Sequence, residues 1–210
     1  DIREFWDGQA KKYDSSLDAT TPDPLAKELE IDALKNVLDT DAYTLEAGCG
    51  NGYNIFQLKD FLKGKIVGFD YSPSMIDTAN KSLLASNDLQ DKVRFLCANI
   101  LDDLSFLGEF QQIYTDRCLI NLLSTEQQIE AVVRLAEILQ PGGRLILVES
   151  TQQGQEALNG LREQVGLEKI PYHWHNFYLE EDEFLAKIPS NLKLEKAINF
   201  SSLYFVISRV

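Results

Sequence analysis

The feature that most constrains this fold is a regular alternation of apolar, strand-like runs with segments of helical spacing. Five such runs fall at residues 43–48, 65–70, 93–99, 110–116 and 144–150. Where strands and helices alternate in this way, the strands run in the same direction and the helices cover both faces of the sheet. The alternation therefore predicts an α/β fold with a mostly parallel sheet and helices on both faces.

Capping residues mark the helices between these runs. A helical pattern covers residues 53–62, and Ser72 followed by a proline is a suitable start for the next helix. Ser124 has a glutamine three residues later, which is the spacing of a capping box. We expect this helix to run from Ser124 to Leu139 and to be stopped by the Pro-Gly-Gly at 141–143.

The two ends of the chain depart from this alternation. The first forty residues read as helices, and residues 167–182 form an aromatic-rich irregular segment before a helix at about 180–187. Residues 192–210 contain two strand-like runs with no room for a crossover helix between them, so the runs pair antiparallel or lie apart. No linker-like composition divides the chain, and we expect residues 1–210 to form a single domain.

The negative net charge of the chain disfavours some classes of binding partner. The 210 residues carry a formal net charge of −13, and the field of such a surface repels phosphate backbones and anionic membranes. A nucleic-acid partner is therefore disfavoured. The longest apolar runs are strand-length, well short of the roughly 20 residues that a membrane helix needs, so we expect no membrane span.

Three cysteines, Cys49, Cys97 and Cys118, occur without Cys-x-x-Cys spacing. Each lies in or beside a strand that we expect to be buried, which suits reduced thiols and a cytoplasmic location. The chain begins at Asp1 without a methionine, so we expect a trimmed chain or part of a longer polypeptide. The sequence does not indicate the oligomeric state.

A glycine-rich turn follows the first strand-like run. Residues 45–54 read Leu-Glu-Ala-Gly-Cys-Gly-Asn-Gly-Tyr-Asn, and in an open α/β sheet ligands bind beyond the carboxyl ends of the strands. A dinucleotide-binding loop has the spacing Gly-x-Gly-x-x-Gly, but here Tyr53 stands where its last glycine belongs. The spacing therefore disfavours a nicotinamide or flavin dinucleotide, and that fingerprint has no place for Glu46.

The residues Glu-x-Gly-x-Gly-x-Gly at 46–52 resemble motif I of the class I S-adenosylmethionine-dependent methyltransferases. Asp70 at the end of the second strand, Cys-Ala-Asn-Ile at 97–100 and Leu-Gln-Pro-Gly-Gly at 139–143 fall at matching places. Phe-Trp-Asp-Gly-Gln-Ala-Lys-Lys-Tyr-Asp at 5–14 resembles the opening that many small-molecule members carry over the cofactor. The resemblance implies a Rossmann-like sheet of seven strands, mostly parallel, with an antiparallel C-terminal hairpin formed by 192–210.

The same resemblance implies how the cofactor, S-adenosylmethionine, would be held. Glu46 would bind its amino group, Asp70 would accept bonds from both ribose hydroxyls, and Tyr13 would face the sulfonium. The family commonly has Asp where this chain has Asn99, whose amide oxygen can still accept from the adenine. The residues expected to contact the cofactor are Tyr13, Glu46, Gly48, Cys49, Gly50, Gly52, Asp70, Tyr71, Met75, Asn99, Ile100 and Arg117.

Two further segments are candidates for the acceptor site. Arg117 and Asn121 follow the fourth strand in a stretch that resembles methyltransferases of sugars and other small hydroxylated acceptors. Arg117 suits a carboxylate of the acceptor or of methionine, or a structural ion pair, and Asn121 suits a hydroxyl. Glu149, at the end of the fifth strand, opens toward the same place and could orient a base.

The segment Pro-Tyr-His-Trp-His at 171–175 is the second candidate. In extended chain His173 and His175 point to one side and Trp174 to the other. A neutral histidine is a suitable general base for a hydroxyl acceptor, and Tyr172 and Trp174 suit stacking on that acceptor. Packing as a lid explains the histidines equally well, and two histidines without a third ligand make a poor metal site.

The sequence thus predicts a methyltransferase in which residues 1–40 cap the cofactor and residues 151–190 face the acceptor. Its expected reaction is in-line transfer of a methyl group from S-adenosylmethionine to a hydroxyl of a small molecule or glycan, with His173, His175, Arg117 and Glu149 as catalytic candidates. The alternatives are N- or C-methylation of a small metabolite and a non-catalytic S-adenosylmethionine-binding module. A nicotinamide-dependent dehydrogenase is a remote alternative.

Overall fold

Five parallel strands form the centre of the protein. The computed structural model describes residues 1–86 and 88–210. Its strands are β1 (Thr44–Ala47), β2 (Ile66–Asp70), β3 (Val93–Cys97), β4 (Phe110–Asp116) and β5 (Leu139–Val148). They lie in the order β3-β2-β1-β4-β5, and every pair is parallel. The predicted α/β, Rossmann-like architecture is confirmed for this part of the sheet.

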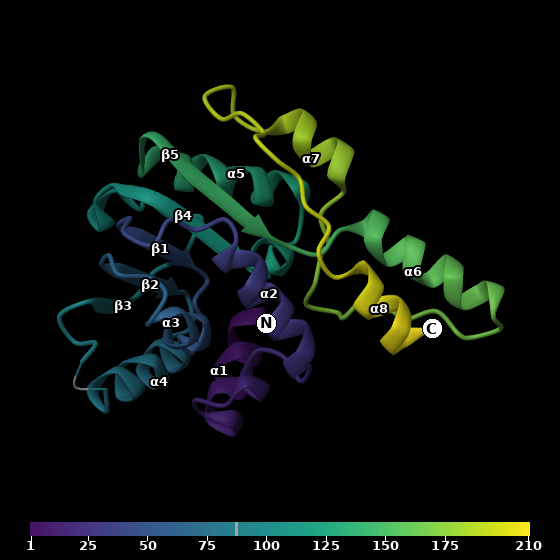
Figure 1. The fold of residues 1–210 in the computed structure, drawn as a ribbon, viewed down its shortest axis with the longest axis horizontal. Coiled ribbons are helices and arrows are strands. Elements are labelled where there is room, and N and C mark those ends of the chain that lie inside the picture. The colour runs from purple at the N-terminus through teal and green to yellow at the C-terminus, as the bar shows by residue number, and fades with distance from the viewer. Residues whose placement is uncertain (87) are drawn as a thin grey trace.

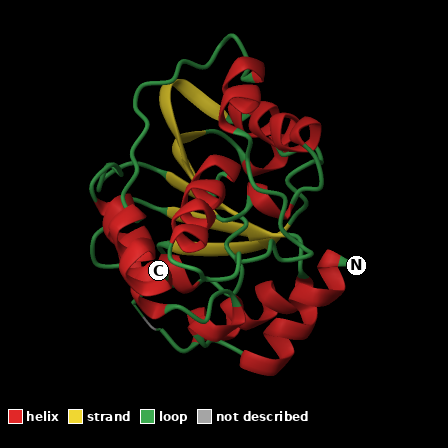
Figure 2. Ribbon diagram, turned by 90° about the vertical axis from the view of Figure 1, so that its right-hand side faces the viewer, coloured by secondary structure: helices red, strands yellow, loops and turns green. Residues whose placement is uncertain are grey.

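Helices cover both faces of this sheet (Figures 1 and 2). Apolar residues of α2 (Pro24–Lys35), α3 (Tyr53–Leu58) and α4 (Pro73–Leu84) pack in one core cluster with one face of the strands. A second cluster joins the other face to α5 (Thr125–Glu137) and α7 (Glu181–Lys187). Both faces of the central strands are therefore buried, which explains their continuous apolar runs.

Local chemistry fixes where several helices begin. The side chain of Ser72 accepts a hydrogen bond from the backbone N–H of Met75, and a proline occupies the first turn of α4. Ser124 caps α5 in the same way through the N–H of Gln127, at 3.3 Å. Both starts agree with the capping residues in the sequence, because side-chain oxygens satisfy N–H groups that have no partner inside the helix.

The remaining helices lie at the ends of the chain. The helix α1 (Ile2–Tyr13) and the short turn η1 (Leu17–Ala19) precede α2, and α1 packs on α4. The helices α6 (Gln152–Gln164) and α8 (Ser202–Arg209) pack on each other beyond the end of β5 (Figure 1). Two more single turns, η2 (Ser105–Leu107) and η3 (Leu119–Asn121), flank β4.

The predicted seven-stranded sheet with a C-terminal hairpin is wrong for the described residues. The sheet has five strands, and the last segment forms α8 where strands were expected. Short apolar runs fit helix and strand equally well in sequence, so tertiary contacts decide. Here the hydroxyl of Tyr204 donates to Asp23 at 2.7 Å and Arg209 pairs with the same carboxylate, which ties α8 to the start of α2.

Two smaller expectations also need correction. The helix α5 ends at Glu137, and β5 already begins at Leu139, so the Pro-Gly-Gly lies inside the strand. There Phe110 pairs with Leu139 and Gln112 with Arg144, which leaves extra residues of β5 as an irregularity at its start. Cys97 is exposed, although we expected it beside a buried strand. No helix in the described ranges is long and apolar enough to cross a membrane.

The middle of β2 is closely packed around Gly68, and this contact provides a test of the fold. A Cβ added there would lie 2.8 Å from Cδ1 of Ile55 and 2.9 Å from Cδ1 of Phe95. Overpacking of this kind typically costs about 1–3 kcal/mol. We therefore expect Gly68→Ala to lower the free energy of unfolding by that amount in urea denaturation.

The matched control for this substitution is Gly160→Ala. Gly160 lies in α6, and a Cβ there would have no atom within 4 Å. This variant should be neutral or more stable by up to about 1 kcal/mol, because alanine is the better helix former. Equal stability of Gly68→Ala and wild type would contradict the packing described for β2.

Candidate active site

The site lies where the strand order reverses, at the carboxyl ends of β1 and β4. The chain leaves β1 toward β2 on one side, while β4 lies on its other side. Loops that leave these two strands diverge, and the gap between them is the place where open α/β sheets bind ligands. An open cleft there is lined by residues from both loops, among them Gly48, Gly50, Asp116 and Arg117.

The glycine-rich turn forms the floor of this cleft. Gly48, Gly50 and Gly52 all have positive φ angles, of 74°, 53° and 81°. Side chains rarely adopt this conformation, so glycine is needed for the turn. A Cβ on Gly48 would also lie 2.4 Å from Sγ of Cys118. The turn therefore brings bare backbone against the loop that follows β4.

Asp70 lies on the β2 side of the cleft. Its Oδ2 accepts from the N–H of Gly50 at 2.9 Å and its Oδ1 from the N–H of Ser72 at 2.8 Å. Burial raises the pKa of Asp70 to about 6, against the opposing effect of these backbone donors. Each oxygen keeps a further lone pair, so the carboxylate suits a ligand that carries adjacent hydroxyls.

The helix α1 is fixed beside Asp70 by Asp7. Its carboxylate accepts from the hydroxyl of Ser72 at 2.5 Å and from the N–H of Ser74 at 3.2 Å, at the start of α4. Met75, Asn99 and Ile100 line the same side of the cleft, together with Tyr71. The residues expected to hold ribose and adenine thus lie together, next to the glycine-rich turn.

On the β4 side, Glu46 lies in a cluster of buried charges. Glu46 is opposite Tyr114 in the pairing of β1 with β4, and Asp116 is two residues further along β4. Side chains two apart on a strand share a face, so both acids face α2 and α3. Asn54 on α3 donates to both, to Glu46 at 2.8 Å and to Asp116 at 2.9 Å.

Two cations from neighbouring segments complete this cluster. The ammonium of Lys27 on α2 lies 2.5 Å from Asp116 and 2.6 Å from Glu30. Nε of Arg117 lies 3.5 Å from Glu30, and the backbone of Arg117 has a φ of 54°, in the left-handed region. Strained residues of this kind are held by their surroundings and cluster at functional sites.

A small cavity of about 40 Å³ opens onto this cluster, lined by Lys27, Glu46, Asp116 and Arg117 and by the glycine-rich turn. Within the part of the chain that the structure describes, Oε2 of Glu46 and Oδ1 of Asp116 have no hydrogen-bond partner. Buried carboxylate oxygens without donors are unusual in folded proteins. Two residues that line the cavity therefore each have an unpaired carboxyl oxygen.

The protonation states follow from burial and from the neighbouring charges. Burial raises the pKa of Glu46 to about 8; Asn54 opposes this, and the negative charge of Asp116 adds to it. Burial would also raise the pKa of Asp116, but Lys27 and Arg117 hold it below its usual value. Near pH 7 the empty site thus contains an ionised Asp116 and a mostly protonated Glu46.

Glu149 organises the loop that follows β4. Its carboxylate accepts from three successive N–H groups, those of Cys118, Leu119 and Ile120, at 3.0 to 3.3 Å. The hydroxyl of Thr115 also donates to it, at 2.7 Å. Burial raises the pKa of Glu149 to about 7, although these donors favour its charged form.

The cleft is also lined by an aromatic wall, which consists of Phe5, Trp6, His173, Trp174 and His175. The ring of His175 stacks on Phe5 of α1, with 4.5 Å between ring centroids, and on His173 at 5.6 Å. Trp6 lies edge-on to His175, and its Nε1 donates to Oδ1 of Asn121 at 3.2 Å. Asn121 in turn donates to the carbonyl of Arg117 at 2.8 Å, which joins α1 to the loop after β4.

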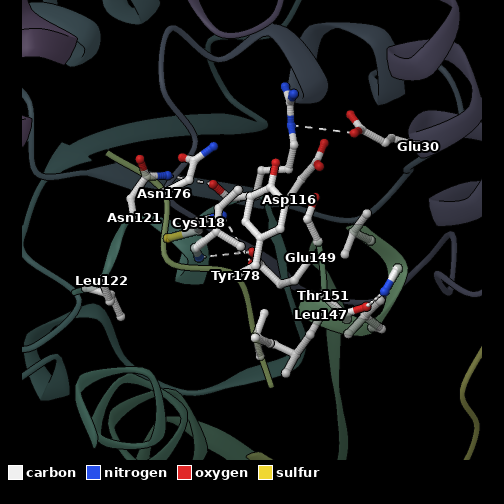
Figure 3. Close-up of a pocket in the computed structure, with 18 of the residues that line it drawn as sticks. Glu30, Asp116, Cys118, Asn121, Leu122, Leu147, Glu149, Thr151, Asn176 and Tyr178 are labelled. Atoms are coloured by element: carbon white, nitrogen blue, oxygen red, sulfur yellow. Dashed lines mark hydrogen bonds and ion pairs between the residues drawn. The ribbon is translucent and has the colours of Figure 1, made fainter. Parts of the chain in front are cut away.

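Figure 3 shows how the two sides of the pocket face each other. The side chains of Asn121, Asn176 and Cys118 lie on one side, and those of Glu30 and Glu149 on the other, with Tyr178 across the opening. All of these residues line the cleft. Carboxyl groups and aromatic groups therefore both line this cleft.

Some of the expected site residues lie elsewhere. Tyr13 packs against the cluster of Ala10, Ala19 and Met75, and it is not among the residues that line the cleft. The ring of Tyr172 is edge-on to Tyr178 at 5.1 Å, away from the cleft. Trp174 lines the rim but is 64% exposed.

Most of the other expected residues line the open cleft or the small cavity. Gly48, Gly50, Asp70, Tyr71, Met75, Asn99, Ile100, Arg117, Asn121, Glu149, His173 and His175 line the open cleft, and Glu46 and Cys49 line the small cavity. Gly52 lies against the rings of Phe95 and Phe56, where a Cβ would not fit. No group of three or more potential metal ligands occurs among the described residues.

Several residues of the site were not predicted from the sequence. Lys27 and Glu30 belong to no motif, and only the packing of α2 on the sheet brings them to the glycine-rich turn. Asp116 lies at the end of a predicted strand. Because ligands bind beyond the carboxyl ends of such strands, its place in the site could have been predicted. Phe5 and Trp6 lie in the recognised N-terminal pattern, but the pattern did not indicate that they contact His175.

Comparisons with known proteins agree with this geometry. Residues 44–143 match the family described as "Methyltransferase domain". The methyltransferase CcbJ from Streptomyces caelestis is 25% identical, with a TM-score of 0.60 over 72% of this chain and 59% of that one. The glycopeptide N-methyltransferase MtfA, solved with S-adenosylmethionine, is 19% identical, with a TM-score of 0.53 over 61% of this chain and 56% of that one.

The chain spans less than two thirds of the length of both of these structures. The family match begins at the first residue of β1 and ends within β5, so it contains the glycine-rich turn, Asp70 and Asp116. Residues 44–143 are therefore similar to a methyltransferase domain, and the sheet that they form resembles the fold of the CcbJ methyltransferase.

Proposed function

We propose that the protein transfers a methyl group from S-adenosylmethionine to a hydroxyl of a small molecule or glycan. The observation that carries this proposal is the position of His175, a partly buried imidazole in the same cleft as the glycine-rich turn and Asp70. A hydroxyl is a weak nucleophile, and a positioned base is the usual means of activating it.

The residues of the cleft fit the cofactor. The free oxygens of Glu46 and Asp116 suit its ammonium group, and Asp70 suits its two ribose hydroxyls. A pyrophosphate would instead meet the carboxylates of Glu46, Asp70 and Asp116 around the turn. This concentration of acids argues against the nicotinamide dinucleotide alternative.

When bound, S-adenosylmethionine supplies an electrophilic methyl group on a sulfonium. The protein contributes mainly by positioning, because an in-line displacement depends on the alignment of its reactants. Residues 1–40 cap the cofactor through α1, which Asp7 fixes on the start of α4. Residues 151–190 face the acceptor through the segment around His175, which is bonded to η3 from the N–H of Phe177 to the carbonyl of Ile120 at 2.6 Å.

His175 is the better base of the two histidines. Burial, followed by the nearby His173, lowers the pKa of His175, so its ring is neutral at physiological pH. Its Nδ1 is buried and has no hydrogen-bond partner among the described residues. A neutral ring with an unpaired nitrogen can accept the proton that an acceptor hydroxyl loses. Trp6, which is edge-on to His175, bonds to Asn121, the second residue that we propose for that hydroxyl.

Glu149 supports this arrangement indirectly. Its bonds to three successive N–H groups hold the loop that carries Arg117 and Asn121. We assign it a positioning role, because these backbone donors and Thr115 occupy its carboxylate. Arg117 is paired with Glu30 and points toward the cofactor side of the cleft, where it lines the small cavity.

The aromatic wall suits an acceptor with apolar faces. Phe5, Trp6 and Trp174 form T-shaped pairs or stacks around His175, and such surfaces bind aromatic rings or the C–H faces of sugars. No lysine is part of this wall, and the net charge of −13 disfavours polyanionic acceptors.

A first prediction concerns Glu46 and pH. The cofactor's ammonium needs the ionised carboxylate, yet the pKa of Glu46 in the empty site is about 8. Binding below that pH must therefore release a proton. We expect the affinity for S-adenosylhomocysteine to rise between pH 6.5 and 7.5, by up to about tenfold per unit. Isothermal titration calorimetry measures this directly.

The control for this prediction is Glu46→Gln. This variant should bind S-adenosylhomocysteine about ten- to a hundredfold more weakly, the value of a hydrogen bond to a charged group, and its affinity should no longer rise over this range. The facing groups Asp116 and Lys27 stay ionised there, since the pKa of Asp116 is lowered and that of Lys27 raised. Tyr114 stays neutral because its pKa is raised. A pH-independent wild type would contradict the protonation state assigned to Glu46.

A second prediction concerns His175. We expect His175→Ala to lower kcat for hydroxyl acceptors by about 10²- to 10³-fold, as for loss of a general base, with little change in affinity for S-adenosylhomocysteine. Release of S-adenosylhomocysteine over a panel of phenols and glycosides measures this. His173→Ala is the matched control and should lower kcat less than about tenfold. Turnover of amines alone would replace the hydroxyl proposal by N-methylation.

A further inference from the structure

Lys27 is an unusual residue for its place in the fold. Its side chain is 5% exposed, although it lies on α2 next to the glycine-rich turn. A buried ammonium is costly unless it is paired. The pairing is provided by Asp116 and Glu30, at 2.5 and 2.6 Å. The methyl transfer proposed above assigns no task to this lysine.

The ammonium of Lys27 has donor capacity left over. An ammonium carries three N–H donors, and the two carboxylates account for two of them. Lys27 and Arg117 both line the small cavity of about 40 Å³. The same cavity contains the free oxygens of Glu46 and Asp116, both from residues that are at least nine-tenths buried.

The balance of charges points to the type of ligand. Lys27 and Arg117 carry two positive charges and face the carboxyl groups of Asp116 and Glu30, while the raised pKa of Glu46 keeps it mostly neutral in the empty site. A purely anionic ligand would meet Asp116, and a purely cationic one would meet Lys27. A ligand that brings one charge of each sign meets an opposite charge for each of its two groups.

We propose that Lys27 and Asp116 recognise the zwitterionic amino-acid end of S-adenosylmethionine. The third N–H of Lys27 binds the carboxylate of the ligand, and Oδ1 of Asp116 accepts from its ammonium beside Glu46. This inference rests on the proposed use of the cofactor. It adds Lys27, from outside the recognised motif, to the role already proposed for Asp116. The ion pair between Lys27 and Asp116 positions an ammonium for the carboxylate of the ligand and a carboxylate for its ammonium.

The test compares three adenosyl ligands by calorimetry. These are S-adenosylhomocysteine, its decarboxylated analogue, which keeps the amine, and 5′-methylthioadenosine, which lacks the whole amino-acid end. We expect Lys27→Met to weaken S-adenosylhomocysteine at least tenfold and to leave 5′-methylthioadenosine within twofold. The decarboxylated analogue should bind this variant as well as wild type or more tightly, because Asp116 is no longer neutralised.

Two other variants separate recognition from structural support. Asp116→Asn should weaken both amine-containing ligands and leave 5′-methylthioadenosine unchanged. Lys27→Gln keeps a donor for Asp116 and should weaken S-adenosylhomocysteine alone, which keeps the test decisive if Lys27→Met fails to fold. Lys35→Met is the matched control at the end of the same helix, where Lys35 is 40% exposed, and it should change none of the three affinities.

The outcomes distinguish this inference from the proposed function. Equal weakening of 5′-methylthioadenosine and S-adenosylhomocysteine by Lys27→Met and Lys27→Gln would make Lys27 purely structural and overturn the inference. Unchanged binding of all ligands would overturn it as well. Neither result depends on the acceptor, so the hydroxyl proposal would stand. Wild-type binding of S-adenosylhomocysteine without methylation of any hydroxyl compound would leave the inference intact and overturn the proposed function.

Discussion

The site depends on the neutralisation of two acids that the sheet places side by side. Glu46 and Asp116 lie on neighbouring parallel strands and face the same side, because strand pairing fixes their register. Two buried carboxylates cannot both be ionised without compensation. Lys27 from α2 supplies a charge to Asp116, and Asn54 from α3 donates to both acids. The packing of α2 and α3 on the sheet and the chemistry of the cleft are thus linked.

The helix α1 joins the two halves of the cleft. On the side of Asp70, Asp7 bonds to the start of α4. On the side of His175, Trp6 bonds to Asn121 and lies edge-on to the His175 ring. Neighbouring residues of one helix therefore contact both sides. A shift of α1 would therefore affect both sides of the cleft together.

Much of the cofactor side could be predicted from the sequence, since glycine spacing and strand ends are local features. The acceptor side and the C-terminal segment could not. Residues 192–210 have no periodicity that separates helix from strand, and the contacts of Tyr204 and Arg209 with Asp23 favour α8. Tyr13 fits the recognised pattern, yet it packs on Met75. A motif identifies a residue's place along the chain but not the direction of its side chain.

The sequence by itself determined the parallel α/β architecture, the glycine-rich turn and the acid at Glu46, because each follows from residue type and spacing within one strand–turn–helix unit. Only the tertiary structure decided which charges meet there. Lys27 and Asp116 are 89 residues apart, and His175 reaches Phe5 only when both ends of the chain pack over the sheet. Contacts of this kind depend on how helices dock on a common sheet, and no local pattern encodes the distance between them.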